Sequence, residues 1–226
     1  ITLRGMATLV GLVLHWKLDE TAAGTVADET GNFPGTHFGA VVPGQADVPP
    51  GATGYSASFL GGDARRPQYD APLNQGSISA ACWVKYTAVL GGNATPLSVI
   101  NGFTGWCLRY EDWEDPDKWG AQIGIAPSSW GDLTSTHAPV TNAWCHLAIT
   151  IDEPTDTWRL YVNGNKEDQK TWNVTHNQGA RLTVGSRQGG YPFHGLIDDV
   201  QIYNILLEDD DILFLHQNPG YAVGQR

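Results

Sequence analysis

The strongest fold signal in the chain is a pair of alternating segments joined by a tight turn. Residues 143–152 and 157–165 alternate apolar and polar side chains, which is the period of a half-buried β-strand. Asn163 and Gly164 both tolerate the positive φ angles of a two-residue hairpin loop, so the chain is expected to turn there and return over 166–172. An antiparallel hairpin is therefore predicted in this part of the chain.

Short segments of the same kind follow one another along the chain, separated by turns rich in glycine and proline. The 226 residues include 27 Gly and 13 Pro, which favour turns over long helices. The other segments expected to form strands are 12–18, 54–62, 77–86, 97–100, 105–110, 121–125, 182–185 and 195–204. Residues 41–52 are expected to be a Pro-rich connection, and 207–216 to be a helix whose acidic start suits the helix dipole. The pattern predicts an all-β fold, an antiparallel β-sandwich or jelly roll with one short C-terminal helix.

The length fits one large β-domain, because all-β sandwiches of this size are commonly single domains. Residues 12–216 are predicted to form that domain. Residues 1–11 are interpreted as an N-terminal extension that includes a cloning remnant, and residues 217–226 as a C-terminal tail. The apolar run 8–14 lacks the basic leader of a signal peptide, so a natural signal is expected outside this sequence.

The charge balance excludes two classes of partner. The chain has 24 acidic and 13 basic residues and a net charge of −11, which repels nucleic acid and anionic membranes. The same negative charge favours the binding of a cation such as Ca²⁺. No apolar run reaches the roughly 18 residues of a membrane-spanning helix, so membrane insertion is not expected.

The three cysteines, Cys82, Cys107 and Cys145, are an odd number and match no zinc-binding spacing. Each lies in an apolar segment that is expected to be a strand. Buried free thiols are therefore predicted, and one disulfide with a spare thiol is the alternative.

The segment 195–204 carries the first indication of a metal. Strict alternation places Asp198 with Leu196, Val200 and Ile202 on one face, which is otherwise apolar. A buried carboxylate is costly unless a cation, an Arg or several backbone N–H groups compensate it. The Asp- and Gly-rich loop 28–36 can bring oxygen atoms together, as calcium loops do. A tight turn with self-bonded Asp and Asn side chains is the alternative for that loop.

Eight segments together carry a family resemblance. They are LHWKLDE (14–20), DETGN (28–32), YSASF (55–59), SAACWVK (79–85), WCHLAIT (144–150), LYVNG (160–164), LTVG (182–185) and GLIDDVQIYN (195–204). In this order the chain resembles the laminin G-like, concanavalin A-like jelly-roll domains of extracellular multidomain proteins. The resemblance implies two stacked, curved antiparallel sheets whose first and last strands are neighbours. It also implies a secreted or cell-surface location and a lectin-like role.

The resemblance further implies a structural Ca²⁺ between the loop 28–36 and the strand that bears Asp198. The implied ligands are oxygen atoms of Asp28, Thr30, Asn32, Gly35, Thr36 and Asp198, with Asp199 and Asp19 as weaker candidates. Chelation of this ion is expected to lower the melting temperature.

No catalytic residue is predicted. The acidic run 111–117 invites comparison with the carboxylate pairs of glycosidases. Pro116 and Lys118 favour a solvated loop there, which lacks the strand scaffold that holds two carboxylates at a defined distance. The sequence also lacks the G-x-S-x-G and H-E-x-x-H motifs, and its histidines are scattered. A non-catalytic module is therefore expected, with a polysaccharide hydrolase or lyase as the remaining enzyme alternative.

Aromatic residues supply the candidate ligand site. Trp113 and Trp130 lie in polar segments expected to be exposed loops, where an indole can stack on the apolar face of a sugar. The full candidate set for carbohydrate binding is Trp113, Trp130, Tyr110, Trp119, Arg187 and Tyr191. The expected partner is a carbohydrate or glycoprotein. The alternatives are that these rings cap the core, or that the chain is a structural or protein-interaction domain.

Overall fold

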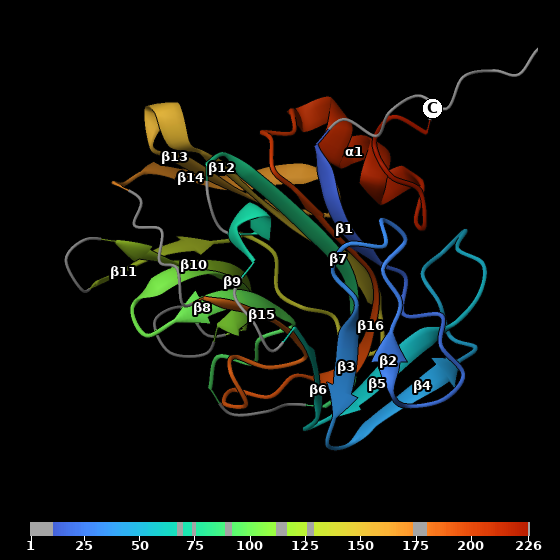
Figure 1. Cartoon of the computed structure of the whole chain (residues 1–226). Coiled ribbons are helices and arrows are strands. Elements are labelled where there is room, and N and C mark those ends of the chain that lie inside the picture. Colours follow the sequence, from blue (N-terminus) through green and yellow to red (C-terminus); the bar gives the residue numbers. More distant parts are fainter. Residues whose placement is uncertain are drawn as a thin grey trace, which may run out of the picture.

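The computed structural model describes residues 11–66, 70–73, 76–88, 92–111, 117–125, 129–173 and 180–225. Within these residues the chain forms sixteen strands, two short 3₁₀ turns and one α-helix (Figure 1). The prediction of an all-β fold with one short C-terminal helix is confirmed.

The strands are short and follow one another closely. They are β1 (Leu12–Trp16), β2 (Thr25–Val26), β3 (Gly35–Phe38), β4 (Val41–Gln45), β5 (Ser56–Leu60), β6 (Asp63–Arg65), β7 (Ile78–Tyr86), β8 (Leu97–Asn101), β9 (Thr104–Glu111), β10 (Lys118–Ile125), β11 (Ser129–Thr134), β12 (Trp144–Asp152), β13 (Thr157–Val162), β14 (Asn165–Thr171), β15 (Arg181–Val184) and β16 (His194–Tyr203). The 3₁₀ turns are η1 (Ala71–Leu73) and η2 (Glu153–Thr155), and the helix is α1 (Asp209–Gln217).

Two antiparallel sheets of eight strands each stack face to face. Sheet A has the order β14-β13-β12-β7-β16-β5-β4, with β1 also paired to β16, and sheet B has the order β11-β10-β9-β8-β15-β6-β3-β2. The pairing of β1 with β16 confirms that the first and last strands are neighbours. The predicted hairpin is also present, because β13 and β14 pair around Asn163 and Gly164, whose φ angles are 50° and 79°.

The main core fills the space between the sheets. Alternate residues of most strands contribute to it, including Trp16, Phe59, Trp106 and Trp158, which are fully buried. All three cysteines are buried and free, as predicted. Burial raises the pKa of the Cys145 thiol to about 12, so this thiol stays protonated at neutral pH.

A second, smaller core lies on the outer face of sheet A, under α1 (Figure 1). Ile212 and Leu215 of the helix pack there against Tyr161 and Tyr203 of the sheet. The acidic residues predicted to suit the helix dipole lie in the first turn of α1, and Asp211 also accepts the backbone N–H of Glu208 in a capping box. The segment after the helix also packs on this face, where Ala222 is fully buried. None of the helices in the described ranges is long and apolar enough to cross a membrane.

Strand β16 departs from the strict alternation expected for 195–204. Its pairing with β7 shifts register between Asp198 and Gln201, and Asp199 has a φ of 51°, which marks a β-bulge. The extra residue turns Ile197, Val200 and Ile202 toward the main core. The expectation that Asp198 shares an apolar face with Val200 and Ile202 was therefore wrong. The side chains of Asp198 and Asp199 both lie on the outer side of sheet A. There they line the same cavity.

Five other differences concern short or polar strands. The segment 41–52 begins with strand β4, although a connection was expected there. Strands β2, β3, β6 and β11 were not expected either. Trp130 consequently lies in β11 and not in a loop.

Candidate functional site

The candidate ligand site lies on the outer face of sheet B, the face turned away from the main core. Leu108 and Tyr110 of β9 point into the core, so Arg109 between them points outward. The same alternation in β10 turns Ala121 and Ile123 inward and Gln122 outward. Register then places Gln122 opposite Asp132 of β11, so that polar side chains of three adjacent strands meet.

Hydrogen bonds join these side chains into one network. Arg109 donates from Nη2 to Asp132 Oδ1 over 2.9 Å and from Nη1 to Asn93 Oδ1 over 3.1 Å. Gln122 donates from Nε2 to the same Asp132 oxygen over 3.1 Å and accepts from Arg187 Nη1 over 2.6 Å. Arg109 and Gln122 are buried, which makes these charge-assisted bonds stronger than their exposed equivalents. The network therefore holds Arg187 in one orientation over the sheet.

Aromatic rings surround Arg187. Its guanidinium carbon lies 4.3 Å from the ring centre of Trp130 and 5.7 Å from that of Tyr191, both within cation–π range. The rings of Phe103 and Trp130 are 5.7 Å apart. Tyr191 and Phe103 are 48% and 53% exposed, while Trp130 is half-buried. This arrangement presents rings to solvent beside a fixed cation, and we call Phe103, Trp130, Arg187 and Tyr191 the aromatic platform.

A strained loop positions two members of the platform. The loop after β15 is closed by reciprocal backbone hydrogen bonds of 2.8 and 2.9 Å between Arg187 and Gly190. Gln188 and Tyr191 adopt positive φ angles of 52° and 49°, which non-glycine residues rarely do. Ser186 supports the loop by accepting the N–H of Gly189 on its hydroxyl, over 3.0 Å. Strain of this kind is commonly found at binding sites.

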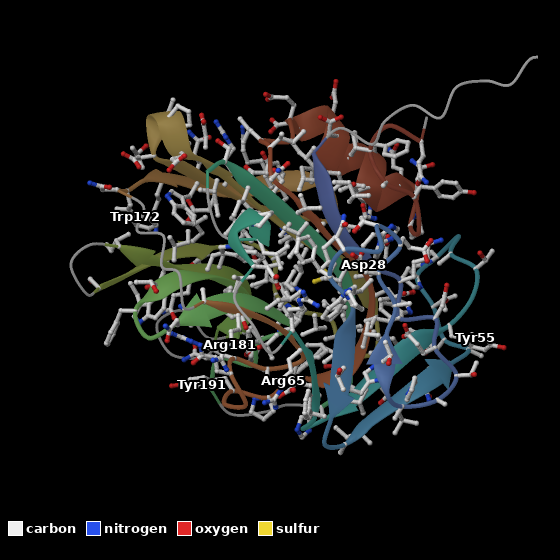
Figure 2. The ribbon with its side chains drawn as sticks, in the orientation of Figure 1. Asp28, Tyr55, Arg65, Trp172, Arg181 and Tyr191 are labelled. Carbon is white, nitrogen blue, oxygen red and sulfur yellow. The ribbon has the colours of Figure 1, made fainter. Side chains whose placement is uncertain are left out.

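A cavity of about 540 Å³ adjoins the platform on the same sheet. Its lining residues are Phe38, Arg65, Arg66, Asn101, Arg181, Thr183 and Gln188. Gln188 lines the cavity, while Arg187 and Tyr191 of the same loop belong to the platform. The loop therefore lies between the platform and the cavity. Figure 2 labels Arg65, Arg181 and Tyr191 in this part of the molecule. We call this space the arginine cavity.

The structure brings together three of the six residues predicted to bind carbohydrate: Trp130, Arg187 and Tyr191. Tyr110 and Trp119 are 3% and 2% exposed and belong to the main core, so their predicted role at the surface is corrected. The reason is the pleat of β9 and β10, which turns both rings inward. Trp113 lies outside the described residues.

Sequence reasoning missed the polar half of the site, which consists of Arg109, Gln122 and Asp132, and one exposed ring, Phe103. The sequence signal that could have located Arg109 and Gln122 is the alternation of apolar and polar residues along a strand. Arg109 and Gln122 each lie between two apolar residues, so a strict period of two would have placed both on the outer face. Their contact with Arg187 depends on sheet pairing, which the sequence did not show.

The loop expected to bind calcium is built around hydrogen bonds to Asp28. This carboxylate accepts from the backbone N–H groups of His15, Thr30, Asn32 and Phe33, at 2.8 to 3.2 Å, and from the Thr30 hydroxyl at 2.5 Å. A carboxylate offers about four lone-pair positions, so Asp28 is fully used by protein donors. It does not fit the role of a calcium ligand in this conformation.

The other residues expected in that loop are spread around Asp28. Asn32 and Thr36 are exposed, while Gly35 packs against the Trp16 ring. Asn32 donates to Thr30 through its side-chain amide, over 3.3 Å. The loop therefore has the self-bonded turn that was the alternative to a metal loop.

Asp198 and Asp199 have different environments in spite of being neighbours. Asp198 is 5% exposed, and burial together with repulsion from Asp199 and Asp19 raises its pKa to about 9. Burial also acts to raise the pKa of Asp199, but His15 at 2.7 Å and the N–H of Gly220 at 2.7 Å outweigh it, so the pKa is lowered. Asp199 thus has three hydrogen-bond partners, including the Gln201 amide at 2.9 Å, whereas the backbone hydrogen bond from Asp199 does not outweigh the burial of Asp198.

Asp198 lines a cavity of about 220 Å³ together with Lys17, Asp19 and Asp199. Asp19 accepts the N–H of Tyr55 over 2.6 Å. In the ranges that the structure describes, no three His, Cys, Asp or Glu side chains gather in a geometry that could hold a metal ion. The predicted calcium ion stays a prediction.

These features define the class of protein. Two stacked antiparallel sheets, with the first and last strands paired, form a concanavalin A-like jelly roll. The model of the family described as the concanavalin A-like lectin/glucanases superfamily matches residues 60–213, more than half of the chain. The chain belongs to this superfamily. Among curated proteins no match was found.

Several solved structures share the fold. Domain 4 of AbnA, a GH43 extracellular arabinanase from Geobacillus stearothermophilus solved in complex with arabinotriose, has a TM-score of 0.75 and 23% identity, over 93% of this chain and 100% of that domain. The binding domain of Paraclostridial Mosquitocidal Protein 1 has a TM-score of 0.66 and 15% identity, over 91% of this chain and 52% of that one. The binding domain of Botulinum Neurotoxin DC in complex with SialylT has a TM-score of 0.64 and 16% identity, over 92% and 51%. This chain thus spans about half of the two toxin binding domains, and at these identities the likeness shows the fold.

Proposed function

We propose that this chain is a non-catalytic carbohydrate-binding module that binds its glycan on the outer face of sheet B. The observation that carries the proposal is the aromatic platform. Trp130 and Tyr191 flank Arg187, whose guanidinium is fixed 4.3 Å from the Trp130 ring centre by its hydrogen bond to Gln122.

The platform offers what a sugar needs. An indole or phenol face packs against the apolar C–H face of a pyranose or furanose ring, and nearby polar groups pair with its hydroxyls. Arg187 has donors, and Asp132 is an acceptor whose side chain is 26% exposed. Because buried Arg109 and Gln122 already hold these groups, binding loses little side-chain entropy.

Two solved relatives support a carbohydrate ligand. Domain 4 of AbnA is described in complex with arabinotriose, and the neurotoxin DC binding domain in complex with SialylT. We propose a secreted or cell-surface location for the same reason, since the AbnA domain comes from an extracellular enzyme. The chain would then serve a larger extracellular protein as its glycan-binding part.

The proposal of a non-catalytic role rests on the carboxylates near the platform. Asp132 Oδ1 accepts hydrogen bonds from both Arg109 and Gln122, so this carboxylate is already used to hold the network in place. A glycosidase pair requires a second carboxylate across the bound sugar, and the residues that define the platform, Phe103, Trp130, Arg187 and Tyr191, include none. Residues 112–116, which include most of the acidic run, lie outside the described residues.

The test is a glycan array followed by calorimetric titration of the best ligand. We expect Trp130→Ala to weaken binding at least tenfold, about 1.4 kcal/mol. Trp144→Ala is the matched control, because Trp144 is also half-buried but belongs to sheet A, where it donates to Asp47. Absence of binding to every glycan, or equal loss in both variants, would contradict the proposed function.

We retain the structural calcium ion as a separate proposal, limited to the cavity at Asp198. A buried carboxylate with a raised pKa is a group that a divalent cation would ionise and stabilise. Asp19 could add a second oxygen ligand, while Asp28 does not fit. The test is thermal unfolding in EDTA and in excess Ca²⁺, and equal melting temperatures would count against the ion.

A further inference from the structure

The arginines of this chain are unevenly distributed. The net charge is −11, yet five of the eight arginines lie on or beside the outer face of sheet B. These five are Arg65, Arg66, Arg109, Arg181 and Arg187. Asp63, Asp70 and Asp132 pair with Arg65, Arg66 and Arg109, so within the described residues Arg181 and Arg187 are the arginines of this face that have no carboxylate partner and suit a negatively charged ligand.

Arg65 is fixed in place inside the arginine cavity. Its Nε and Nη2 donate to the two oxygens of Asp63 over 2.6 and 2.8 Å, and its guanidinium lies 4.4 Å from the Phe38 ring centre. Asp63 is 3% exposed and also accepts the Ser186 hydroxyl over 3.0 Å. Two nitrogens are thus used for fixation, which leaves Nη1 for a ligand.

Arg66 has a supporting role. It donates to both oxygens of Asp70, over 2.7 and 3.3 Å, and to the carbonyl oxygen of Pro34 over 3.0 Å. These bonds engage all three guanidinium nitrogens. Arg66 therefore lines the cavity, but each of its guanidinium nitrogens already donates a hydrogen bond within the protein.

Arg181 is the cation available for binding. It is exposed at the start of β15, and within the described residues no hydrogen bond or ion pair engages its side chain. Thr183, two residues further along the same strand, pairs in register with Arg65. Side chains two residues apart share a face, so Arg181 and Arg65 face the same cavity.

The cavity continues the aromatic platform. Gln188 lines the cavity and is held by its side-chain hydrogen bond to the carbonyl oxygen of Ile100. The residue before it is Arg187 of the platform. A glycan stacked on Trp130 and Tyr191 can therefore extend its next residues over this loop toward Arg181.

We propose that the glycan bound by this chain is acidic, and that its carboxylate or sulfate group binds Arg181 and Arg65 in the arginine cavity. This inference rests on the proposed function, because it names the class of glycan that the same face of sheet B would take. The guanidinium groups supply planar, charge-assisted donors that match both kinds of anion. The volume of about 540 Å³ is enough for one or two sugar residues.

The experiment measures affinity for three oligosaccharides of equal length: a neutral one, a polyuronate and a sulfated one. Arg181→Ala is compared with Arg159→Ala, which removes the same charge from a half-buried position on β13 of sheet A. We expect Arg181→Ala to weaken binding of at least one acidic oligosaccharide about tenfold, and Arg159→Ala to leave it unchanged. Whichever of the two acidic oligosaccharides responds identifies carboxylate or sulfate as the anion.

Three outcomes separate this inference from the proposed function. Equal affinity for neutral and acidic oligosaccharides, or an unchanged affinity in Arg181→Ala, overturns the inference but leaves the module a glycan binder. Loss of acidic binding in Arg181→Ala with full binding in Trp130→Ala supports the cavity and overturns the platform. Binding of none of the three overturns both. Arg181→Gln keeps the polar chain without its charge, and it should behave like Arg181→Ala if charge is what the ligand recognises.

Discussion

Replacing Asp198 by Asn should make the protein more stable at alkaline pH. The Asp198 carboxyl has its pKa raised from 3.8 to about 9 because it is buried and lies near Asp199 and Asp19. The unfolded chain releases this proton above about pH 3.8, whereas the folded chain holds it up to about pH 9. Stability is therefore lost as the pH rises through this window, by about 1.4 kcal/mol per pH unit. Asn cannot ionise and removes this loss.

The assay is urea unfolding at pH 5 and pH 8 in the presence of EDTA. Across these three pH units we expect the wild type to lose about 4 kcal/mol more than Asp198→Asn. Asp210→Asn, which changes an exposed acid at the start of α1, should follow the wild type. Parallel pH dependence in wild type and Asp198→Asn would refute the reasoning.

Calcium gives the same experiment a second use. An ion bound beside Asp198 would keep the carboxylate ionised, so excess Ca²⁺ should remove most of the wild-type loss between pH 5 and pH 8. Asp198→Asn should respond little to Ca²⁺. If the wild type shows the same loss with and without Ca²⁺, no ion binds at this carboxylate.

Three further predictions concern the fold. Burial and the nearby His216 lower the pKa of His146 from 6.5 to about 3, so stability should fall by about 1.4 kcal/mol per unit as the pH drops below about 6.5, and His146→Gln should flatten this acid limb in urea titrations. Asp28→Ala should cost about 2–3 kcal/mol, because four donors of the loop and the His15 N–H of β1 lose their acceptor; an unchanged urea midpoint would show that the loop is not held by this carboxylate. Gly35→Ala places a Cβ 2.4 Å from the Trp16 ring and should cost about 1–3 kcal/mol by overpacking, and a melting temperature equal to that of the wild type would contradict the close contact.

Elements with strong local signals were predictable from the sequence. The hairpin at Asn163 and Gly164 is set by residues that tolerate positive φ, and the start of α1 by acids that cap it. The longer strands, such as β7 and β12, have enough alternating residues to be recognised. Strands of two to four residues, such as β2 and β3, have too few residues for a period to appear, so pairing decides them.

The bulge in β16 was not predictable from alternation. It depends on how β16 pairs with β7 at one point, and one extra residue there reverses which side chains face the core. For this reason the predicted face of Asp198 was wrong, although its burial was correctly expected. A register that the partner strand sets has no local sequence signal.

The candidate site was predictable in part. Arg187 and Tyr191 belong to a Gly-rich segment that favours an exposed loop, and the structure has them there. Trp130 was assigned to a loop but lies in β11, and it reaches the same site because β11 is the edge strand of sheet B. Tyr110 and Trp119 differ from Trp130 only in the face of the sheet on which they lie. Composition does not distinguish these faces.

The most direct test of glycan binding on sheet B follows the indole N–H signals of the nine tryptophans by two-dimensional NMR during titration with the glycan. The account predicts that the Trp130 signal shifts in proportion to binding, while that of Trp144 on sheet A stays in place. A glycan that binds without moving the Trp130 signal, or that moves Trp144 in its place, would contradict the account.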